Sequence, residues 1–453
     1  MKTDLLNLGI SELTGIKYRC KCGRCHEIQT KKILLGSGAL HKVYDIIREL
    51  DMGNKTLIIA DINTLKAAGE ELERDLTSKG IALKMCIFED NEVHADEKAL
   101  GKVLIDIDPD VEFIIAVGSG TINDIARFIS FKFRKPYIAV ATAPSMDGYA
   151  SSVSPLIVNG FKKTFSATFP IAIIGDTDIL SEAPHELIAA GVGDMLGKVT
   201  ALADWKLSSM INDEYYCPDI SKLVIRAVKR CIESVDGLVK RNRQAVQSLT
   251  EGLILSGIAM QMAGNSRPAS GAEHHVSHYW EMRHLMEGRK SPLHGIKVGV
   301  ATTLVLLMYN KIFKMDKSSL EGHIKTDEEY TAWKEDVLKN FGVLAEDVIA
   351  SHTSSVTEDV MLPQKIEKLK KSWDNLITEI RELFDLIPDV GGLLRKIGAP
   401  GVPGDIGVDF SLVWSGLRLA KEVRERYTVL QLADQIGVLN KYAHEIAEEY
   451  SQT

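Results

Sequence analysis

Histidines are concentrated between residues 272 and 294, where they give the clearest chemical signal in the sequence. The segment 272–278 reads Ala-Glu-His-His-Val-Ser-His, and His294 lies twenty residues after His274. If that segment is helical, His274 and His278 share one face because they are four residues apart. Asp194 stands in another polar segment, Gly-Val-Gly-Asp at 191–194. One carboxylate and two imidazoles suit a divalent transition metal and leave positions open for a substrate, whereas the alternative is a set of ordinary surface histidines.

A second group of metal-ligating side chains lies between residues 20 and 26. It contains Cys20, Cys22, Cys25 and His26 within seven residues. Thiolates and imidazoles are the ligands of structural zinc sites. We therefore expect a structural Zn2+ at Cys20, Cys22 and Cys25, with a missing ligand supplied from elsewhere. The alternative is a short hairpin that carries reduced surface thiols.

Three further clusters could bind a nucleotide or a polyol. Gly-Ser-Gly-Thr at 118–121 follows an apolar run and opens a helical period, which suits a pyrophosphate at a helix N-terminus; the alternative is a tight turn. Thr-Ala-Pro-Ser at 142–145, with Asp147 and Ser151, offers hydroxyls and a carboxylate, or else a helix cap. Asp61 could accept from an adenosine ribose, or could cap the helix that follows.

These residues must be positioned by elements that the apolar pattern predicts. Short runs that are apolar throughout alternate with helical periods and end in turn residues; they cover 33–35, 57–60, 113–117, 137–140 and 171–174. Such runs are typical of parallel strands buried on both faces. Ligands of parallel sheets lie beyond the carboxyl ends of the strands, which is where Asp61, Gly118 and Thr142 stand.

After about residue 184 the strand signals fade and helical periods take over. Helices are expected at 188–205, 220–238, 247–262, 277–286, 296–309, 410–424, 430–436 and 439–450, and the charged stretch 313–375 is also helical in period. The sequence therefore predicts an α/β N-terminal nucleotide-binding domain with a parallel sheet, followed by an all-helical C-terminal domain. The expected divisions are a Cys-rich leader at 1–32, the α/β domain at 33–183 and the helical domain at 184–453.

Composition restricts the classes of partner. The 453 residues carry a formal net charge of −8 without a polybasic block, which argues against nucleic acid and anionic membranes. No uncharged apolar run approaches the ~20 residues that span a bilayer, and the first residues lack the apolar stretch of a signal peptide. We expect a cytoplasmic protein that acts on a small molecule, without membrane insertion, and that forms a homo-oligomer (dimer or larger).

Taken together, five segments resemble one known family. They are Ala-Val-Gly-Ser-Gly-Thr-Ile-Asn-Asp at 116–124, 142–148, Ala-Gly-Val-Gly-Asp-Met-Leu-Gly-Lys at 190–198, 266–278 and Leu-His-Gly at 293–295. The set is similar to the bacterial sn-glycerol-1-phosphate dehydrogenases of the iron-containing alcohol dehydrogenase superfamily, to which glycerol dehydrogenase and dehydroquinate synthase also belong. The resemblance runs from about residue 33 to 310 with all motifs in order, and it does not include the Cys-rich leader.

The resemblance implies a role for each cluster. NAD(P) contacts fall on Asp61, Gly118, Ser119, Gly120, Thr121, Ile122, Thr142, Ala143, Pro144, Ser145 and Ser151. The metal ligands are Asp194, His274 and His294. Asp147, Asp194 and His278 contact the substrate, and Asp194 and His278 are the catalytic pair. Arg267 and Lys198 lie in the right motifs to hold a substrate phosphate.

The implied activity is NAD(P)H-dependent, metal-assisted reduction of dihydroxyacetone phosphate to sn-glycerol 1-phosphate. The metal would polarise the ketone carbonyl as a Lewis acid, and the ligand set does not discriminate between Ni2+, Zn2+ and Fe2+. One alternative is a glycerol or other polyol dehydrogenase of the same superfamily. Another is a non-catalytic nucleotide-binding sensor, against which the intact ligand set argues.

Overall fold

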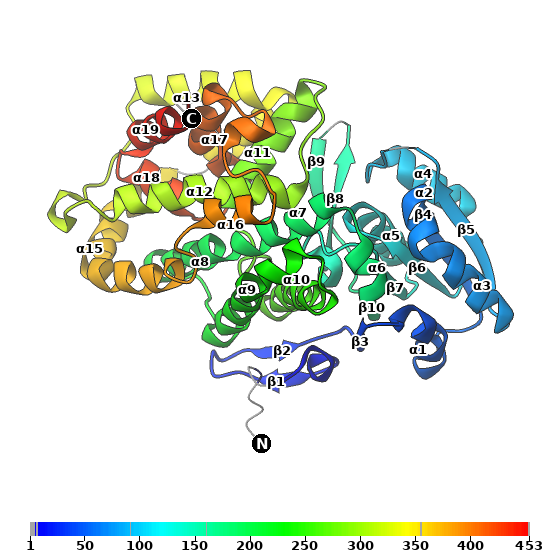
Figure 1. The fold of residues 1–453 in the computed structure, drawn as a ribbon. Helices are drawn as coiled ribbons and strands as arrows, with labels where there is room; N and C mark the ends of the chain where they lie inside the picture. The colour runs from blue at the N-terminus through cyan, green and yellow to red at the C-terminus, as the bar shows by residue number, and fades with distance from the viewer. Residues whose placement is uncertain (1–4, 6–7, 91, 160, 354–355, 452–453) are drawn as a thin grey trace. The chain divides into compact units, whose positions relative to one another are not determined.

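The computed structural model describes residues 5, 8–90, 92–159, 161–353 and 356–451. The chain forms two compact units, each assembled from separate stretches of sequence. Unit 1 contains Met1–Met195, Pro218–Ser266 and Lys396–Gly398, and unit 2 contains Leu196–Cys217, Arg267–Arg395 and Ala399–Thr453. Figure 1 shows the strands in the first part of the chain and helices in the rest, which confirms the expected fold class.

A six-stranded parallel sheet is the centre of unit 1. Its strand order is β3-β10-β7-β6-β4-β5, and every neighbouring pair is parallel. The strands are β3 (Lys32–Gly36), β4 (Lys55–Asp61), β5 (Ala82–Phe88), β6 (Phe113–Gly118), β7 (Tyr137–Ala141) and β10 (Ala172–Asp176). All five expected runs are strands. β5 was not expected, because this edge strand includes Lys84 and buries only part of its side chains.

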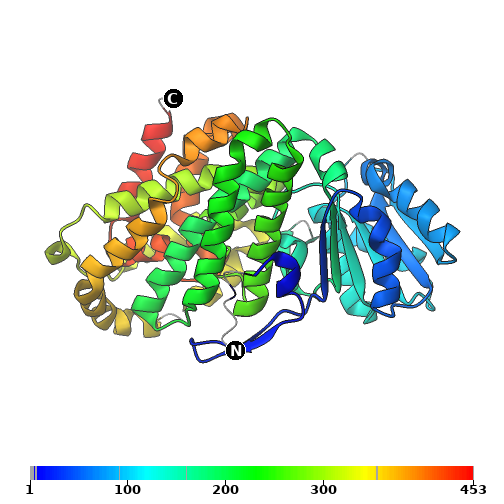
Figure 2. The same ribbon diagram turned by 60° about the horizontal axis from the view of Figure 1, so that its bottom comes forward.

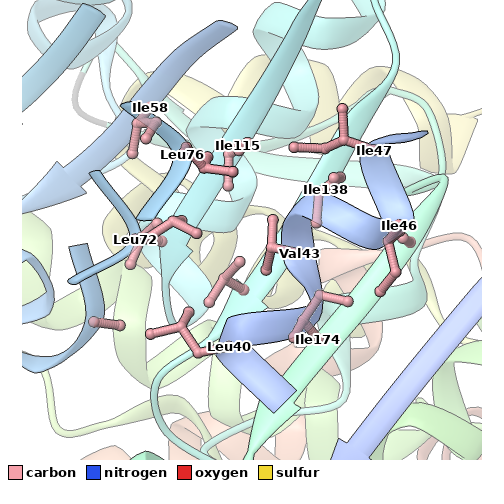
Figure 3. Close-up of a cluster of buried hydrophobic side chains, with 14 of the residues drawn as sticks. Leu40, Val43, Ile46, Ile47, Ile58, Leu72, Leu76, Ile115, Ile138 and Ile174 are labelled. Carbon is pink, nitrogen blue, oxygen red and sulfur yellow. The ribbon is translucent and has the colours of Figure 1, made fainter. Parts of the chain in front are cut away.

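Helices cover both faces of the sheet. On one face α1 (Val43–Glu49) and α3 (Glu70–Ser78) pack into a buried cluster with alternate residues of the strands, such as Ile58, Ile115 and Ile174 (Figure 3). The intervening strand residues face the other way, where α5 (Gly120–Phe133) packs against β6, β4 and β7. Burial of each large aliphatic side chain contributes about 1.5–3 kcal/mol, so this layered core fixes the strand ends on which the polar motifs lie.

The remaining elements of unit 1 include two antiparallel hairpins and five further helices. The hairpins are β1 (Lys17–Arg19) with β2 (Cys25–Glu27), and β8 (Val153–Val158) with β9 (Phe161–Ser166). The helices are α2 (Ile62–Thr64), α4 (Glu97–Asp106), α6 (Thr177–Glu182), α9 (Pro218–Val239) and α10 (Arg243–Ala263), and α7 (His185–Leu196) lies almost wholly in this unit. The helices α9 and α10 form an extensive antiparallel pair.

The regular secondary structure among the described residues of unit 2 is all helical. It contains α8 (Lys198–Asn212), α11 (Ala272–Met286), α12 (His294–Ile312), α13 (Asp327–Phe341), α14 (Ala345–Thr353), α15 (Val356–Phe384), most of α16 (Val390–Lys396), α17 (Phe410–Leu419), α18 (Val429–Gln435) and α19 (Leu439–Ser451). The single helix expected at 188–205 is instead α7 and α8, divided at Gly197, a residue of low helix propensity. The boundary expected at residue 183 stays a prediction.

The helix α12 is long and apolar enough to cross a membrane by length and composition alone. Most of that apolar stretch, 78%, is buried within the fold. Its neighbours include α11, α18 and α19. Packing in the helical core therefore explains the composition of α12.

Candidate functional site

The predicted nucleotide residues of unit 1 stand along one edge of the sheet. The strands β4, β6 and β7 are neighbours and end at Asp61, Gly118 and Ala141. Gly118 pairs with Ala141 in the sheet, and the Thr142 amide donates to the Gly118 carbonyl oxygen over 3.3 Å. The three segments that were expected to meet a nucleotide thus follow adjacent strand ends.

The glycine-rich segment leads directly into α5. Ser119 occupies the N-cap position, and its side chain makes no capping hydrogen bond. The first amides of α5, from Gly120 to Ile122, are therefore the kind of donors that a phosphate binds at a helix N-terminus. Gly118 also has a packing role, because a Cβ there would lie 2.6 Å from the Cβ of Ile122.

Asp61 caps the helix that follows β4. Its Oδ1 accepts from the amides of Asn63 and Thr64 at 2.8 and 2.9 Å, and Thr64 Oγ1 accepts from the Asp61 amide. The capping alternative is therefore confirmed. Contact with an adenosine ribose stays a prediction, and it would fall to the other carboxylate oxygen.

The 142–151 segment is held by buried contacts within unit 1. The Tyr149 hydroxyl donates to the Ala143 carbonyl oxygen at 2.8 Å and also lies 3.4 Å from that of Gly118, which joins two of the predicted nucleotide loops. Ser151 Oγ accepts from the Val153 amide at 3.1 Å, so this hydroxyl supports the turn into β8. Ser145 is also buried, and its amide donates to the Ala143 carbonyl oxygen over 3.0 Å.

Asp147 and Asp194 lie in contact in unit 1. The Asp147 amide donates to Asp194 Oδ2 over 2.9 Å, and Asp147 Oδ2 accepts from the Ser256 hydroxyl over 2.8 Å. Both side chains are buried, Asp194 completely. The two aspartates that the resemblance assigns to the substrate are therefore brought into contact, through the backbone of Asp147, although they lie 47 residues apart in sequence.

The three predicted site histidines converge in unit 2. His274 and His278 lie one turn apart on α11, and His294 is the first residue of α12. The ring of His294 is 5.2 Å from that of His274 and 5.6 Å from that of His278, measured between centroids. His274 and His294 each present a ring nitrogen within 4.8 Å of the other. The expected shared face of His274 and His278 is thus confirmed.

Glu273 orients His274 and was missed by the sequence reasoning. Its Oε1 lies 2.7 Å from His274 Nδ1 and accepts from the Gly271 amide, while Oε2 accepts from Thr200 at 2.8 Å. Burial opposes ionisation of this carboxyl, but these hydrogen bonds hold its pKa below the usual value. A carboxylate bonded to Nδ1 directs the Nε2 lone pair of the imidazole outward, an arrangement common among metal-binding histidines.

His278 stands between an acidic and a basic neighbour. Its Nδ1 lies 3.5 Å from Glu281 Oε2, and its Nε2 lies 3.5 Å from Arg424 Nη2. Lys297 Nζ, buried, is 3.4 Å from the same Glu281 oxygen. Arg424 was not predicted either, since it lies 146 residues along the chain and no spacing rule links the two positions.

The two cations proposed for a substrate phosphate are engaged elsewhere in unit 2. Arg267 donates from Nε and Nη2 to the two oxygens of Glu214, at 2.7 and 2.5 Å, and from Nη1 to the Tyr427 carbonyl oxygen. Lys198, fully buried, donates to the Ala269 carbonyl oxygen over 3.2 Å. Because Glu214 neutralises Arg267, this guanidinium is poorly suited to bind a phosphate as well.

The cysteine-rich segment brings together a different set from the one expected. Cys25 is exposed on β2, whereas Cys20 and His26 are buried and Cys22 is partly buried. One ligand atom from each of Cys20, Cys22 and His26 lies within 4.8 Å of the others. His26 therefore takes the place that the sequence reasoning gave to Cys25.

Comparison with known proteins identifies the class of this fold. Residues 34–184 match the family model described as iron-containing alcohol dehydrogenase. The fold is similar to maleylacetate reductase from Agrobacterium tumefaciens, with a TM-score of 0.59 at 14% identity over 93% of this chain and 98% of that one. It is also similar to a probable glycerol dehydrogenase from Sinorhizobium meliloti 1021, with a TM-score of 0.58 at 15% identity over 91% and 98%.

Relatives of higher sequence identity indicate the family within this class. The chain is 35% identical to a protein named glycerol-1-phosphate dehydrogenase (NAD(P)+) from Halalkalibacterium halodurans, over 94% of this chain and 98% of the relative. It is 34% identical to a protein of the same name from Geobacillus stearothermophilus, over 95% and 99%. The chain belongs to the glycerol-1-phosphate dehydrogenase family, an NAD(P)-dependent oxidoreductase family, and the resemblance noted from the sequence is confirmed.

Proposed function

We propose that this protein catalyses the reversible reduction of dihydroxyacetone phosphate to sn-glycerol 1-phosphate with NADH or NADPH. The observation that carries the proposal is the match along nearly the whole chain to relatives named for that dehydrogenase activity. The sheet-edge residues of unit 1 and the histidines of unit 2 supply the side chains that such a reaction requires. We place the activity in the cytoplasm and expect a homo-oligomer.

Asp194, His274 and His294 would hold the divalent metal, which is Ni2+, Zn2+ or Fe2+. The contact of Glu273 with His274 Nδ1 supports this assignment, because it leaves Nε2 for a metal. Chain connectivity supports it as well. Lys198 and Thr200 contact Ala269 and Glu273, and Asp194 precedes Lys198 by only four residues, a span of about 14 Å at most. When bound, the ion would polarise the ketone carbonyl of the substrate.

The residues of the chain have distinct roles in this proposal. The first amides of α5 bind the nucleotide pyrophosphate, and Asp61 accepts from the adenosine ribose. The loop at 142–145, with Ser151, holds the nicotinamide half. Asp147 accepts from a substrate hydroxyl, and His278 orients the substrate or relays a proton to its oxygen. Hydride transfer needs the nicotinamide within roughly 3–3.5 Å of the carbonyl carbon, so the two residue sets must meet during turnover.

A steady-state assay tests the proposal. Chelated protein is reloaded with Ni2+, Zn2+ or Fe2+, and NADH and NADPH oxidation is followed with dihydroxyacetone phosphate and with dihydroxyacetone. We expect turnover of the phosphorylated ketone that disappears on chelation, with sn-glycerol 1-phosphate as the product. Faster turnover of dihydroxyacetone would favour a polyol dehydrogenase, and binding of the nucleotide without turnover of any ketone would favour a sensor.

A further inference from the structure

The tight turn between β1 and β2 carries two of the cysteines, Cys20 and Cys22. The Cys20 amide donates to the Arg24 carbonyl oxygen over 2.9 Å, and the Gly23 amide donates to that of Cys20 over 3.1 Å. The Cys22 amide lies 3.5 Å from Cys20 Sγ, and Gly23 adopts a φ of 89°, which favours glycine. An amide that points at a cysteine sulfur can donate a hydrogen bond to the thiolate, which is the form that binds metals.

His26 is oriented as a metal ligand. It is 1% exposed, and its Nδ1 lies 2.7 Å from the Met262 carbonyl oxygen on α10. A carbonyl oxygen can only accept, so the proton resides on Nδ1 and the Nε2 lone pair is available. That Nε2 lies 3.3 Å from Cys22 Sγ. Metal-binding histidines commonly donate their other ring N–H to such a carbonyl oxygen, which fixes the orientation and the tautomer of the ring. The Met262 carbonyl oxygen has this role for His26.

We propose that Cys20, Cys22, His26 and Cys217 bind a structural Zn2+ that is separate from the catalytic metal. Cys217 immediately precedes Pro218, the first residue of α9. The Asp219 carboxylate, two residues further on, lies 3.4 Å from Cys20 Sγ, so connectivity keeps Cys217 near the hairpin. Cys217 is also fully buried. Three thiolates and one imidazole form a closed tetrahedral set, which is typical of structural zinc.

The zinc would attach the hairpin to the α9–α10 pair. Figure 2 shows the N-terminal part of the chain, in blue, beside α9 and α10, in green. Strands of three residues, such as β1 and β2, contribute little stability of their own. Zinc binding releases the thiol protons to solvent, and the binding free energy adds to that of folding.

The test uses the whole chain of 453 residues and the matched pair Cys22→Ser and Cys25→Ser. Cys25 belongs to the same hairpin but is exposed, so its substitution controls for the loss of a thiol. After chelation that strips the catalytic ion, elemental analysis should find about one zinc per chain in wild type and Cys25→Ser, and none in Cys22→Ser or Cys217→Ser. Equal zinc loss in Cys22→Ser and Cys25→Ser would overturn the ligand set.

Cobalt substitution keeps the proposal testable where Cys22→Ser or Cys217→Ser fails to fold. Wild type, Cys25→Ser and His274→Ala reloaded with Co2+ should all show the intense near-ultraviolet absorption of cobalt–thiolate bonds. Retention of this band in His274→Ala would separate the site from the catalytic metal. Absence of the band in wild type would overturn the proposal.

A second, independent observation concerns cations beside His278 in unit 2. Arg424 and Arg426 follow the short helix at Ala420–Val423, and the Arg426 amide donates to the Arg424 carbonyl oxygen. Arg426 Nη1 is buried and has no hydrogen-bond partner in the part of unit 2 that the structure describes. Burial and the charges of Arg424 and Arg267 lower the pKa of Arg426 to about 10, and Glu214 opposes them only in part. A buried donor amid like charges is stabilised by an anion.

We infer that Arg424 and Arg426 bind the phosphate group of the substrate, an inference that rests on the proposed function. Arg424 Nη2 lies 3.5 Å from His278 Nε2, so a phosphate held by the two arginines would place the rest of the substrate beside His278. A guanidinium pair suits the dianion because it offers several parallel N–H donors. Unlike Arg267, which Glu214 neutralises, Arg426 retains an unused donor.

Arg426→Gln is compared with Arg381→Gln, which removes an exposed arginine of α15. We expect the KM for dihydroxyacetone phosphate to rise at least about tenfold in Arg426→Gln, with a much smaller change for dihydroxyacetone. Inhibition by inorganic phosphate should weaken in parallel. Equal effects on both ketones would overturn the inference. If wild type reduces no phosphorylated ketone, the proposed function fails, whereas phosphate binding measured by calorimetry still tests the arginine pair.

Discussion

Gly191 allows α7 to approach the loop at 142–145 closely within unit 1. An ideal Cβ at this position would lie 1.9 Å from the Pro144 carbonyl oxygen and 3.0 Å from its carbonyl carbon. Ordinary van der Waals contact begins at 3.4 Å, so the Pro144 carbonyl would have to move by about 1.5 Å. Pro144 belongs to the predicted nicotinamide loop, and Asp194 lies one turn after Gly191. Gly191→Ala therefore pushes this loop away from the helix that carries Asp194.

The expected change in the stability of Gly191→Ala follows from two opposing effects. Overpacking costs about 1–3 kcal/mol, and the upper end applies because the obstacle is backbone rather than a flexible side chain. Replacing glycine by alanine inside a helix stabilises the folded state by about 1 kcal/mol, because alanine has the higher helix propensity. We expect a net destabilisation of about 1–2 kcal/mol. Activity should suffer more, because a misplacement of about 1 Å in a catalytic arrangement can reduce the rate by about 100-fold.

Gly101→Ala on α4 is the matched control. A Cβ at Gly101 meets nothing within 4 Å, so this variant should gain about 0.5–1 kcal/mol and keep full activity. Urea denaturation followed by tryptophan fluorescence measures the stability, and kcat/KM for dihydroxyacetone phosphate measures the activity. If Gly191→Ala keeps kcat/KM within threefold of wild type, where the expected loss is about 100-fold, the coupling between loop and helix is refuted.

Three further substitutions test single residues. His278→Ala should lower kcat by about 100-fold, and elemental analysis should find the catalytic metal retained. Loss of metal would show that His278 is a metal ligand, and full activity would show that it has no part in the active site. Asp61→Ala should shift the NADH/NADPH ratio of kcat/KM away from NADH and lose about 1 kcal/mol of capping, whereas Asp61→Asn should shift the ratio and keep the cap. Burial and the nearby Glu273 raise the pKa of Asp204 from 3.8 to about 7, so folded protein holds a proton that unfolded protein releases between these values. Stability should therefore fall as pH rises through that window, and Asp204→Asn should flatten the profile of Tm against pH; a wild-type Tm that rises through the window contradicts this reasoning.

The central sheet could be predicted because the apolar pattern of the sequence indicates which strands are buried. Runs such as Phe113–Val117 are apolar at every position, which is typical of a strand covered on both faces. The polar residues that end such runs then follow from the rule that parallel sheets bind ligands at their carboxyl edge. The shared face of His274 and His278 followed equally directly from helical spacing.

Contacts between distant residues could not be predicted in this way. Nothing in the sequence pairs Arg424 with His278, and the contact between Glu273 and His274 contradicts the usual expectation that adjacent helical residues face apart. The contact between Glu273 and His274 forms because both residues lie in the first turn of α11. There the carboxylate of Glu273 also accepts a hydrogen bond from the Gly271 amide.

The choice between Cys25 and His26 shows the limit of spacing most clearly. Successive residues of a strand point to opposite faces, so a Cys-His-Glu strand buries either its first and third side chains or its second. The sequence does not say which. In the structure Cys25 and Glu27 are exposed and His26 is buried against α10. The deciding interaction, with the Met262 carbonyl oxygen, comes from a residue 236 positions away.

Three glycines of the functional motifs, Gly118, Gly191 and Gly271, are explained by packing within the protein rather than by the approach of a ligand. Glycines near a nucleotide or metal are usually explained by close approach of the ligand. Here a Cβ at Gly118 would meet the Ile122 side chain at 2.6 Å, and one at Gly271 would meet Asp204 Oδ2 at 2.5 Å. Neither residue has a positive φ, so backbone conformation is not the cause. Each glycine, like Gly191, lets two elements of the protein approach closely where a functional side chain follows. An alanine at any of these positions would therefore alter the site by moving its supporting element, before any ligand is bound.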